Sequence, residues 1–177
     1  NVKLPKKIHE NKKIKFSYQN TKIEITYQHI NKATANHIKQ ENNDETDLTR
    51  LEGHIRYNDI LEGVDLEYLT NTIGVKENII MKKYIENFTF SYNIKITNLK
   101  LVYENNYFYF LNENNEVIYQ IDPYYMIDQK GKRSFDLTIR IDEIKQGEYK
   151  VEVKPNQEWL KEASYPVIID PTINYNN

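Results

Sequence analysis

Cysteine is absent from the 177 residues of this sequence, and glycine and proline are scarce, with five of each. The lack of cysteine excludes disulfide bonds, thiolate metal sites and cysteine nucleophiles. The scattered glycines form no glycine-rich loop of the kind that binds phosphate groups. The chain also lacks a signal peptide and an apolar run of membrane-spanning length, and it starts at Asn1 rather than Met. We therefore expect it to be a segment of a longer protein.

An excess of charge of one sign is also missing. Lys and Arg number 24 against 26 Asp and Glu, which gives a formal net charge of −2. Proteins that bind nucleic acid or anionic membranes usually carry a basic excess. The composition therefore predicts neither nucleic acid nor membrane as a partner.

Tyrosine is what the chain has in plenty, with 15 Tyr against six Phe and one Trp. Tyrosine favours strands, where it can bury its ring and keep its hydroxyl hydrated. Apolar residues alternate with polar ones at Ile14, Phe16 and Tyr18, and the alternation returns over 23–27 after the polar pair Gln19-Asn20. Two alternating runs joined by a short polar turn predict a β-hairpin.

The same alternation continues along most of the chain. It is interrupted by a polar stretch over about 31–49, which we expect to be a mobile loop, a short helix or an insertion, and by a turn at Asn58-Asp59. Only 155–163 has the pattern of a helix, with Asn156 as its N-cap. Further strands are expected at His54–Tyr57, Gly63–Tyr68, Val75–Met81, Phe88–Tyr92, Leu99–Tyr103, Tyr107–Leu111, Val117–Ile121, Phe135–Asp142 and Tyr149–Val153.

Short strands at this spacing predict an all-β fold, a mainly antiparallel β-sandwich or pair of stacked sheets with one short helix near the C-terminus. No segment supplies the crossover helices of a parallel sheet. We expect three parts: a hairpin with its polar loop over 1–50, forming an extension or subdomain, a β-sandwich module over 51–173, and a tail over 174–177.

Two strings of residues carry a family resemblance. The first is Pro123-Tyr-Tyr-Met-Ile-Asp128-Gln-Lys-Gly131-Lys-Arg-Ser134, and the second is Trp159-Leu160 followed by Tyr165-Pro-Val-Ile-Ile-Asp-Pro-Thr-Ile173. With Gly63-Val-Asp-Leu-Glu-Tyr68 and Gly74-Val-Lys-Glu77 in order before them, they resemble the β-rich module that precedes DNRLRE domains in Gram-positive secreted and wall-associated proteins, often of the Rhs/YD-repeat type. The resemblance covers about 55–173. It implies a secreted or cell-wall location and a stalk, spacer or adhesion role.

The resemblance gives no catalytic residues, and the shared positions have structural explanations. Glycine suits turns that need a positive φ, aspartate accepts backbone N–H groups in turns, and proline is tolerated at strand ends. Trp159 is expected to anchor the end of the core. The positions that we assign to this structural signature are Gly63, Asp65, Gly74, Met126, Asp128, Gly131, Trp159, Pro166, Asp170 and Pro171.

The sequence contains no recognisable motif of a catalytic site. Pairs such as Asp65 with Glu67 share a strand face, but so do all solvated carboxylates on strands, and no serine lies in a nucleophile elbow. The four histidines lack the spacing of metal ligands. Calcium is the one cofactor left open, with Asp44 and Asp47 of the acidic stretch 42–47 as weak candidate ligands, although the frame of a calcium loop is absent. We therefore predict that the chain is not an enzyme.

An aromatic surface is the remaining candidate for a binding site. Exposed tyrosine on a sheet can stack on sugar rings, whereas alternation should bury about half of such residues. The leading hypothesis is a non-catalytic spacer or adhesion module whose partners are neighbouring modules of the same polypeptide. The alternative is a carbohydrate- or protein-binding module that recognises cell-wall glycan or a surface protein. The tyrosines expected to form its surface are Tyr103, Tyr107, Tyr109, Tyr119, Tyr124 and Tyr125.

Overall fold

The computed structural model describes residues 2–9, 13–37, 53–70, 74–170 and 172–175. Its strands form two antiparallel sheets, and the helix α1 (Gln157–Glu162) lies near the C-terminus. The all-β antiparallel fold expected from the sequence is therefore confirmed. No helix within the described ranges is long and apolar enough to cross a membrane.

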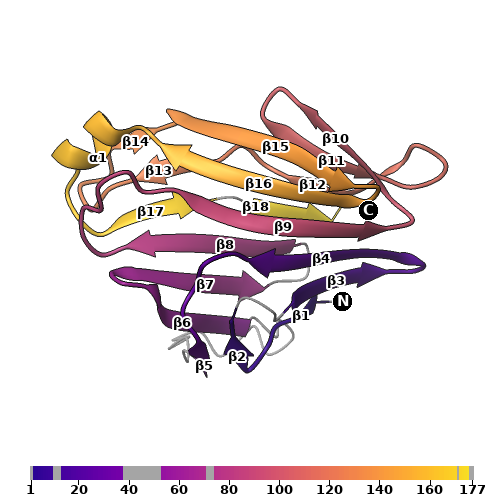
Figure 1. The fold of residues 1–177 in the computed structure, drawn as a ribbon, viewed down its shortest axis with the longest axis horizontal. Helices are drawn as coiled ribbons and strands as arrows, with labels where there is room; N and C mark the ends of the chain where they lie inside the picture. The colour runs from indigo at the N-terminus through magenta and orange to yellow at the C-terminus, as the bar shows by residue number, and fades with distance from the viewer. Residues whose placement is uncertain (1, 10–12, 38–52, 71–73, 171, 176–177) are drawn as a thin grey trace, which may run out of the picture.

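The smaller sheet has six strands in the order β1-β3-β4-β9-β16-β15 (Figure 1). The hairpin predicted near the N-terminus is confirmed, since β3 pairs with β4 and Ile14 lies opposite Ile25. Strand β4 then pairs with β9, a partner more distant in sequence. The bounds are Val2–Lys3 for β1, Lys13–Tyr18 for β3, Thr21–Tyr27 for β4, Phe90–Thr97 for β9, Glu148–Pro155 for β16 and Leu137–Lys145 for β15.

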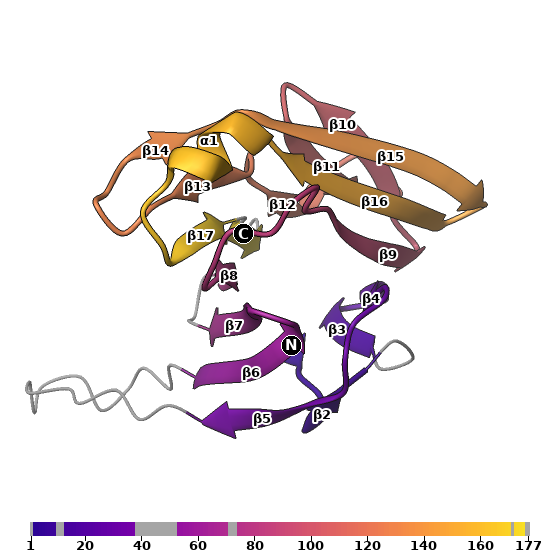
Figure 2. The ribbon, with the colours of Figure 1, turned by 60° about the vertical axis from the view of Figure 1, so that its left-hand side comes forward.

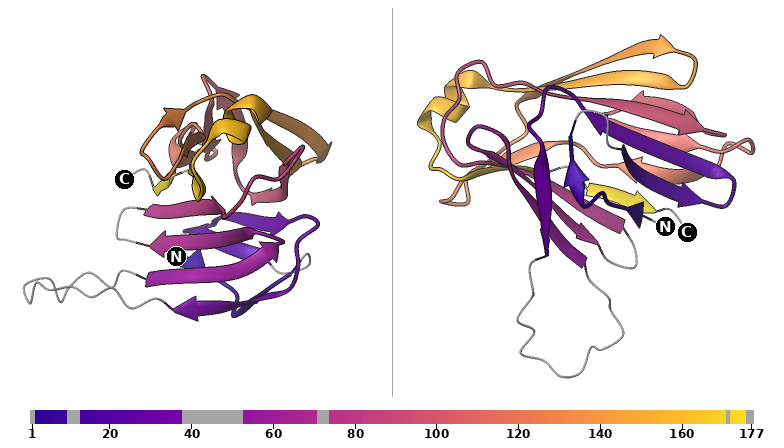
Figure 3. Two further views of the ribbon diagram at one scale, coloured as in Figure 1. Left: turned by 90° about the vertical axis from the view of Figure 1, so that its left-hand side faces the viewer. Right: turned by 60° about the horizontal axis from the view of Figure 1, so that its bottom comes forward.

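The larger sheet has twelve strands, nine of them in the order β10-β11-β12-β18-β8-β7-β6-β5-β2. Strand β17 pairs with β8 and with β13, which also pairs with β14. Figure 3 (left) shows the purple to magenta strands β6, β7 and β8 side by side. The bounds are Lys7–Ile8 for β2, Ala33–His37 for β5, Gly53–Leu61 for β6, Val64–Thr70 for β7, Gly74–Met81 for β8, Lys100–Glu104 for β10, Tyr107–Leu111 for β11, Val117–Ile121 for β12, Tyr125–Ile127 for β13, Arg133–Ser134 for β14, Val167–Asp170 for β17 and Thr172–Tyr175 for β18.

One hydrophobic core lies between the two sheets. Alternation turns Ile23, Ile25 and Tyr27 of β4 inward, and Leu66 and Tyr68 of β7 meet them from the larger sheet. All belong to one cluster of buried residues. The helix α1 lies at the end of the sandwich where β13 and β14 are found (Figure 2), and Leu160 buries its side chain in the same cluster.

Several local predictions differ from the structure, among them the strand expected at Phe88–Tyr92, which lies at Phe90–Thr97. The turn expected at Asn58-Asp59 lies later, because β6 continues to Leu61 through a register shift after Tyr57. The predicted strand 135–142 starts at Leu137, and Phe135 lies outside it with 69% of its surface exposed. The polar stretch 31–49 contains strand β5 over Ala33–His37, and its remainder lies largely outside the described residues.

Candidate functional site

A buried carboxyl group lies in the middle of the core. Glu77 belongs to β8, where alternation turns Val75, Glu77 and Ile79 to the inside of the sandwich. The hydroxyl of Tyr68 donates a hydrogen bond of 2.6 Å to Oε2 of Glu77, and the hydroxyl of Tyr27 donates to the same oxygen. Burial raises the pKa of Glu77 above its ordinary value, an effect that the two hydroxyls reduce in part.

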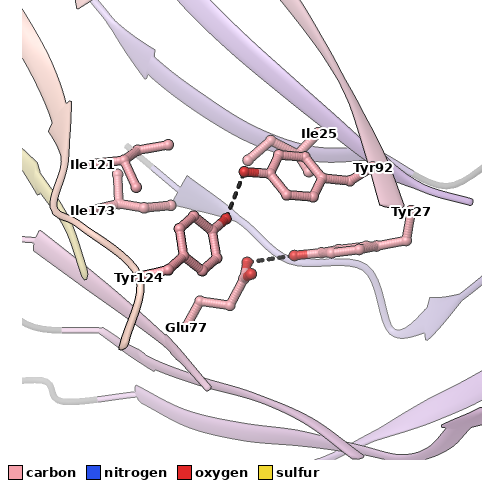
Figure 4. Close-up of a pocket in the computed structure, with 7 residues that line it drawn as sticks. All are labelled: Ile25, Tyr27, Glu77, Tyr92, Ile121, Tyr124 and Ile173. Atoms are coloured by element: carbon pink, nitrogen blue, oxygen red, sulfur yellow. Dashed lines mark hydrogen bonds between the residues drawn. The ribbon is translucent and has the colours of Figure 1, made fainter. Parts of the chain in front are cut away.

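A second pair of tyrosines closes the same region (Figure 4). The hydroxyls of Tyr92 and Tyr124 lie 2.5 Å apart, and burial raises the pKa of both. The cavity between these groups has a volume of about 10 Å³, which is about the space that one water molecule needs. It is lined by Ile25, Tyr27, Glu77, Tyr92, Ile121, Tyr124 and Ile173. The region is therefore part of the core and too small for a substrate.

The opposite, outward side of the larger sheet carries polar residues in rows. Backbone pairing aligns His54 of β6, Leu69 of β7 and Lys76 of β8 across three strands. The next row consists of Arg56, Glu67 and Asn78. We call these outward polar residues, together with Asp65, the β6–β8 polar face: His54, Arg56, Asp65, Glu67, Lys76 and Asn78.

The centre of the β6–β8 polar face is a histidine–carboxylate pair. Nε2 of His54 lies 2.8 Å from Oε2 of Glu67, and the side chains are 15% and 12% exposed. The amide of Asn78 donates a 2.9 Å hydrogen bond to the other oxygen of Glu67. A carboxylate fixed in this way orients the imidazole ring.

Two ion pairs flank this centre. The guanidinium of Arg56 donates hydrogen bonds of 3.1 and 2.6 Å to Oδ2 of Asp65, and Lys82 lies 3.2 Å from Oδ1. Burial tends to raise the pKa of Asp65, but the backbone N–H of Asp59 and the two cations outweigh it, so the pKa is lowered. Lys82 also pairs with Asp59 at 2.8 Å.

The second ion pair joins β8 to β17 and β13. Nζ of Lys76 lies 2.9 Å from Oδ2 of Asp170, which also accepts a 2.7 Å hydrogen bond from the hydroxyl of Tyr125. The pKa of Lys76 is raised by its hydrogen bond to Asp170. The polar face thus combines a histidine–carboxylate pair with two cations that are 30% and 44% exposed, Arg56 and Lys76.

The six tyrosines expected at a binding surface do not lie together. Tyr119 and Tyr124 belong to the buried core, at 0% and 6% exposure. Tyr107 and Tyr109 stack on one another on β11, with ring centroids 5.7 Å apart. Tyr103 is 38% exposed and packs on Phe108. Tyr125 lies at another place, between Asp170, Phe135 and Arg133.

Most residues of the structural signature hold turns and strand ends. Gly63 and Gly131 have φ of 77° and 82°. Asp128 accepts hydrogen bonds from the backbone N–H groups of Lys130, Lys132 and Ser164, which connect the β13–β14 turn to the segment after α1. Burial tends to raise the pKa of Asp128, and these hydrogen bonds lower it below the ordinary value.

The other signature residues lie as follows. Asp65 and Asp170 are held in the ion pairs described above. Gly74 begins β8, Met126 of β13 is fully buried, Trp159 packs partly buried against the core, and Pro166 is exposed. Pro171 and the weak calcium candidates Asp44 and Asp47 lie outside the described residues. Among the residues that are described, no group of three or more His, Asp or Glu is placed to hold a metal ion.

Sequence reasoning did not find Glu77 or the His54–Glu67 pair. The signal for Glu77 was present, because its carboxyl falls on the apolar phase of the alternation in 75–81. The pairing of His54 with Glu67 depends on the register of β6 and β7, which a single sequence does not give.

The chain is similar in sequence to three proteins that are named as nucleases. It is 26% identical over 127 residues to a protein of Bacillus spizizenii named tRNA3(Ser)-specific nuclease WapA. Identity is equally 26% to the tRNA nuclease WapA of Bacillus subtilis strain 168 and to the tRNA(Glu)-specific nuclease WapA of Bacillus subtilis subsp. natto. The match covers 67% of this chain and 5% of each relative. No protein-family model and no solved structure matches the chain.

These relatives contradict two expectations from the sequence. The chain was expected to be a non-catalytic spacer, adhesion or binding module and not an enzyme, whereas all three relatives are named as enzymes that act on tRNA. The prediction rested on the absence of catalytic motifs, and such an absence does not exclude chemistry by groups that lie on separate strands. The resemblance to modules that precede DNRLRE domains, and the secreted or wall location that it implies, stay predictions.

Proposed function

We propose that this chain is part of a nuclease that acts on tRNA. The observation that carries the proposal is the similarity over 127 residues to three tRNA nucleases. Because the chain spans about 5% of the length of those relatives, the activity has to be argued for this chain from its own residues. The β6–β8 polar face is the part of the described structure with the chemistry that RNA cleavage needs.

RNA contains its own nucleophile, the 2′-hydroxyl next to each phosphodiester. Its attack requires a base for the hydroxyl proton and cations for the negative charge that develops on phosphate oxygens. Histidine suits the first role because its ordinary pKa lies near neutral pH. His54, oriented by Glu67 and Asn78, is the base in this proposal, and Arg56 and Lys76 are the cations.

The spacing of the face agrees with these roles. His54 and Lys76 belong to one row and are separated by one strand, which places their backbones about 10 Å apart. Leu69 lies between them in the row, and Lys76 is paired with Asp170 of β17. A phosphate that contacts both side chains therefore has to draw Lys76 away from Asp170. In the reaction the 2′-oxygen bonds to phosphorus and its proton passes to His54. The bond from phosphorus to the 5′-oxygen breaks, and that oxygen takes a proton from water.

The test is cleavage of tRNA by the purified 177-residue chain and by His54→Asn. Loss of a general base should lower the cleavage rate by about 100-fold or more. His29→Asn is the matched control, because His29 is exposed and has a φ of 56°, a conformation that asparagine tolerates well. The control should cleave at the wild-type rate.

The products provide a second readout. Attack by the 2′-hydroxyl leaves a 2′,3′-cyclic phosphate on the upstream fragment, which mass spectrometry detects. A folded wild-type chain that leaves tRNA intact would refute the assignment of cleavage to this chain. Cleavage that His54→Asn leaves unchanged would refute the assignment to the β6–β8 polar face.

A further inference from the structure

A groove crosses the outward side of the smaller sheet, away from the β6–β8 polar face. Its volume is about 170 Å³, and strands β3, β4, β9, β15 and β16 contribute to its lining. Backbone pairing aligns Lys15, Glu24, Lys95 and Glu148 in one row across four strands. The lining residues are Lys13, Glu24, Thr26, Asn93, Ile94, Lys95, Ile144 and Glu148.

Positive charge predominates around the groove although the whole chain is slightly acidic. Glu24 lies 3.1 Å from Lys13 and 4.0 Å from Lys22, and Glu148 lies 4.0 Å from Lys95 and 3.6 Å from Lys145. Six lysines thus surround these two carboxylates and Asp142, which lies opposite Lys150. They are Lys13, Lys15, Lys22, Lys95, Lys145 and Lys150.

The environment of Glu24 favours its charged form and fixes its position. Burial tends to raise the pKa of Glu24, but the nearby lysines, with Lys13 first, outweigh it and lower the pKa. Glu24 is only 8% exposed, so its geometry is fixed. A fixed carboxylate among lysines accepts hydrogen bonds from hydroxyl groups, while the surplus of lysine attracts an anion.

Two further features point to a ligand with hydroxyl groups and an apolar surface. Asn93, which lines the groove between Thr26 and Lys150, has a buried Oδ1 without a hydrogen-bond partner. Buried acceptors are normally paired. A register shift between Glu143 and Lys145 leaves Ile144 56% exposed at the edge of the groove. Such bulges reorient side chains and are frequent next to functional sites.

We propose that this groove binds a ribose-phosphate unit of single-stranded RNA. Lys13 and Lys95 contact the phosphate, and Ile144 packs against the sugar. Glu24 accepts hydrogen bonds from ribose hydroxyls, as does Asn93 after its side chain turns its buried oxygen toward the groove. The groove is smaller than the 300–1,000 Å³, roughly, of enclosed ligand pockets. It therefore suits one unit of a polymer that runs across the sheet. The inference rests on the proposed action on tRNA and assigns a second RNA contact, distinct from the cleavage site.

The experiment compares the binding of a labelled single-stranded RNA and a DNA of equivalent sequence by fluorescence anisotropy across a salt series. RNA should bind more tightly, because only RNA offers the 2′-hydroxyl. Lys95→Ala should weaken binding of both, and should reduce the slope of log K against log salt by about 0.7. Asn93→Ala should reduce the preference for RNA over DNA.

Lys161→Ala is the matched control. Lys161 is 53% exposed and paired with a glutamate, as Lys95 is, but it lies on α1. An unchanged salt slope for Lys95→Ala, or equal affinity of the wild type for RNA and DNA, would overturn the proposal. Failure of the proposed function gives a different result, since His54→Asn tests cleavage and should leave this binding intact.

Discussion

Glu77 carries an electrostatic cost, because its carboxyl group is buried in the core of the sandwich. Its oxygen accepts hydrogen bonds from Tyr27 and Tyr68, which compensate part of the lost hydration. Burial is nevertheless the dominant effect, so the pKa of Glu77 is raised from its ordinary value of 4.5. The folded protein therefore binds this proton more tightly than the unfolded chain does.

The raised pKa predicts how stability depends on pH. The contribution of Glu77 to the free energy of unfolding is complete below the unfolded pKa near 4.5 and is lost as pH rises through the folded pKa. Glu77→Gln does not titrate and keeps an acceptor for both hydroxyls. We expect the stability of wild type relative to Glu77→Gln to fall with pH above about 4.5. Urea unfolding at a series of pH values measures this difference.

The control for Glu77 is Glu113→Gln, which changes an exposed carboxyl in the same way. Its stability relative to wild type should vary less with pH. A difference between wild type and Glu77→Gln that stays constant from pH 4 to pH 8, roughly the range over which perturbed carboxyls titrate, would contradict the prediction.

For Asp65 we expect the opposite dependence of stability on pH. Its pKa is lowered from 3.8 because the backbone N–H of Asp59 and the side chains of Arg56 and Lys82 outweigh its burial. Asp65→Asn should cost about 2 kcal/mol at neutral pH, less than for a fully buried pair because Arg56 stays partly hydrated. The stability that Asp65 contributes is present above 3.8 and is lost as pH falls through its lower folded pKa.

Asp142→Asn is the comparison for Asp65. Asp142 also pairs with an arginine, Arg140, but the two side chains are 54% and 72% exposed. An exposed pair of this kind contributes about 0–1 kcal/mol. Equal losses of unfolding free energy for the two variants would show that burial of Asp65 is not the source of its effect.

At the scale of elements, α1 depends on its N-cap because it has only six residues. Oδ1 of Asn156 accepts a 2.9 Å hydrogen bond from the backbone N–H of Trp159. Asn156→Ala should therefore lower the free energy of unfolding by about 1 kcal/mol, and Asn156→Asp should restore most of it. Denaturant unfolding measures both, and an aspartate variant as unstable as the alanine variant would contradict the capping role.

The strands also show how much of the fold can be predicted from a single sequence. Alternation predicted the β3–β4 hairpin and the bounds of β11 and β12, because these signals are local. It could not give the pairing of β4 with β9 or of β8 with both β17 and β18, since alternation assigns faces and not partners. Phe135 was misplaced for a related reason. It follows the alternation of β15, yet its ring packs on Tyr125 outside the strand.

At the scale of the whole molecule, charge is distributed unevenly over the surface. A net charge of −2 predicted no nucleic acid partner, but the fold gathers lysines from separate strands on one side of the smaller sheet. Net charge is an average over all faces, whereas an anionic polymer responds to the local field. The sequence alone does not show this local gathering of lysines, because they come together only when β4 pairs with β9.

The strands within residues 2–9 and 13–37 belong to both sheets, and this predicts that the chain folds as one unit. Strands β3 and β4 belong to the smaller sheet, whereas β2 and β5 belong to the larger one. Removal of residues 1–37 would expose the face of β9 that pairs with β4 and would delete Phe16, Ile25 and Tyr27 from the shared core. Burial of such side chains contributes about 1.5–3 kcal/mol each, and a domain is stable by only about 5–15 kcal/mol. The truncated chain should therefore lose its cooperative unfolding transition, measured by circular dichroism and tyrosine fluorescence, while the full chain unfolds in one step. Cooperative unfolding of the truncated chain would instead show that the first strands form a separable extension.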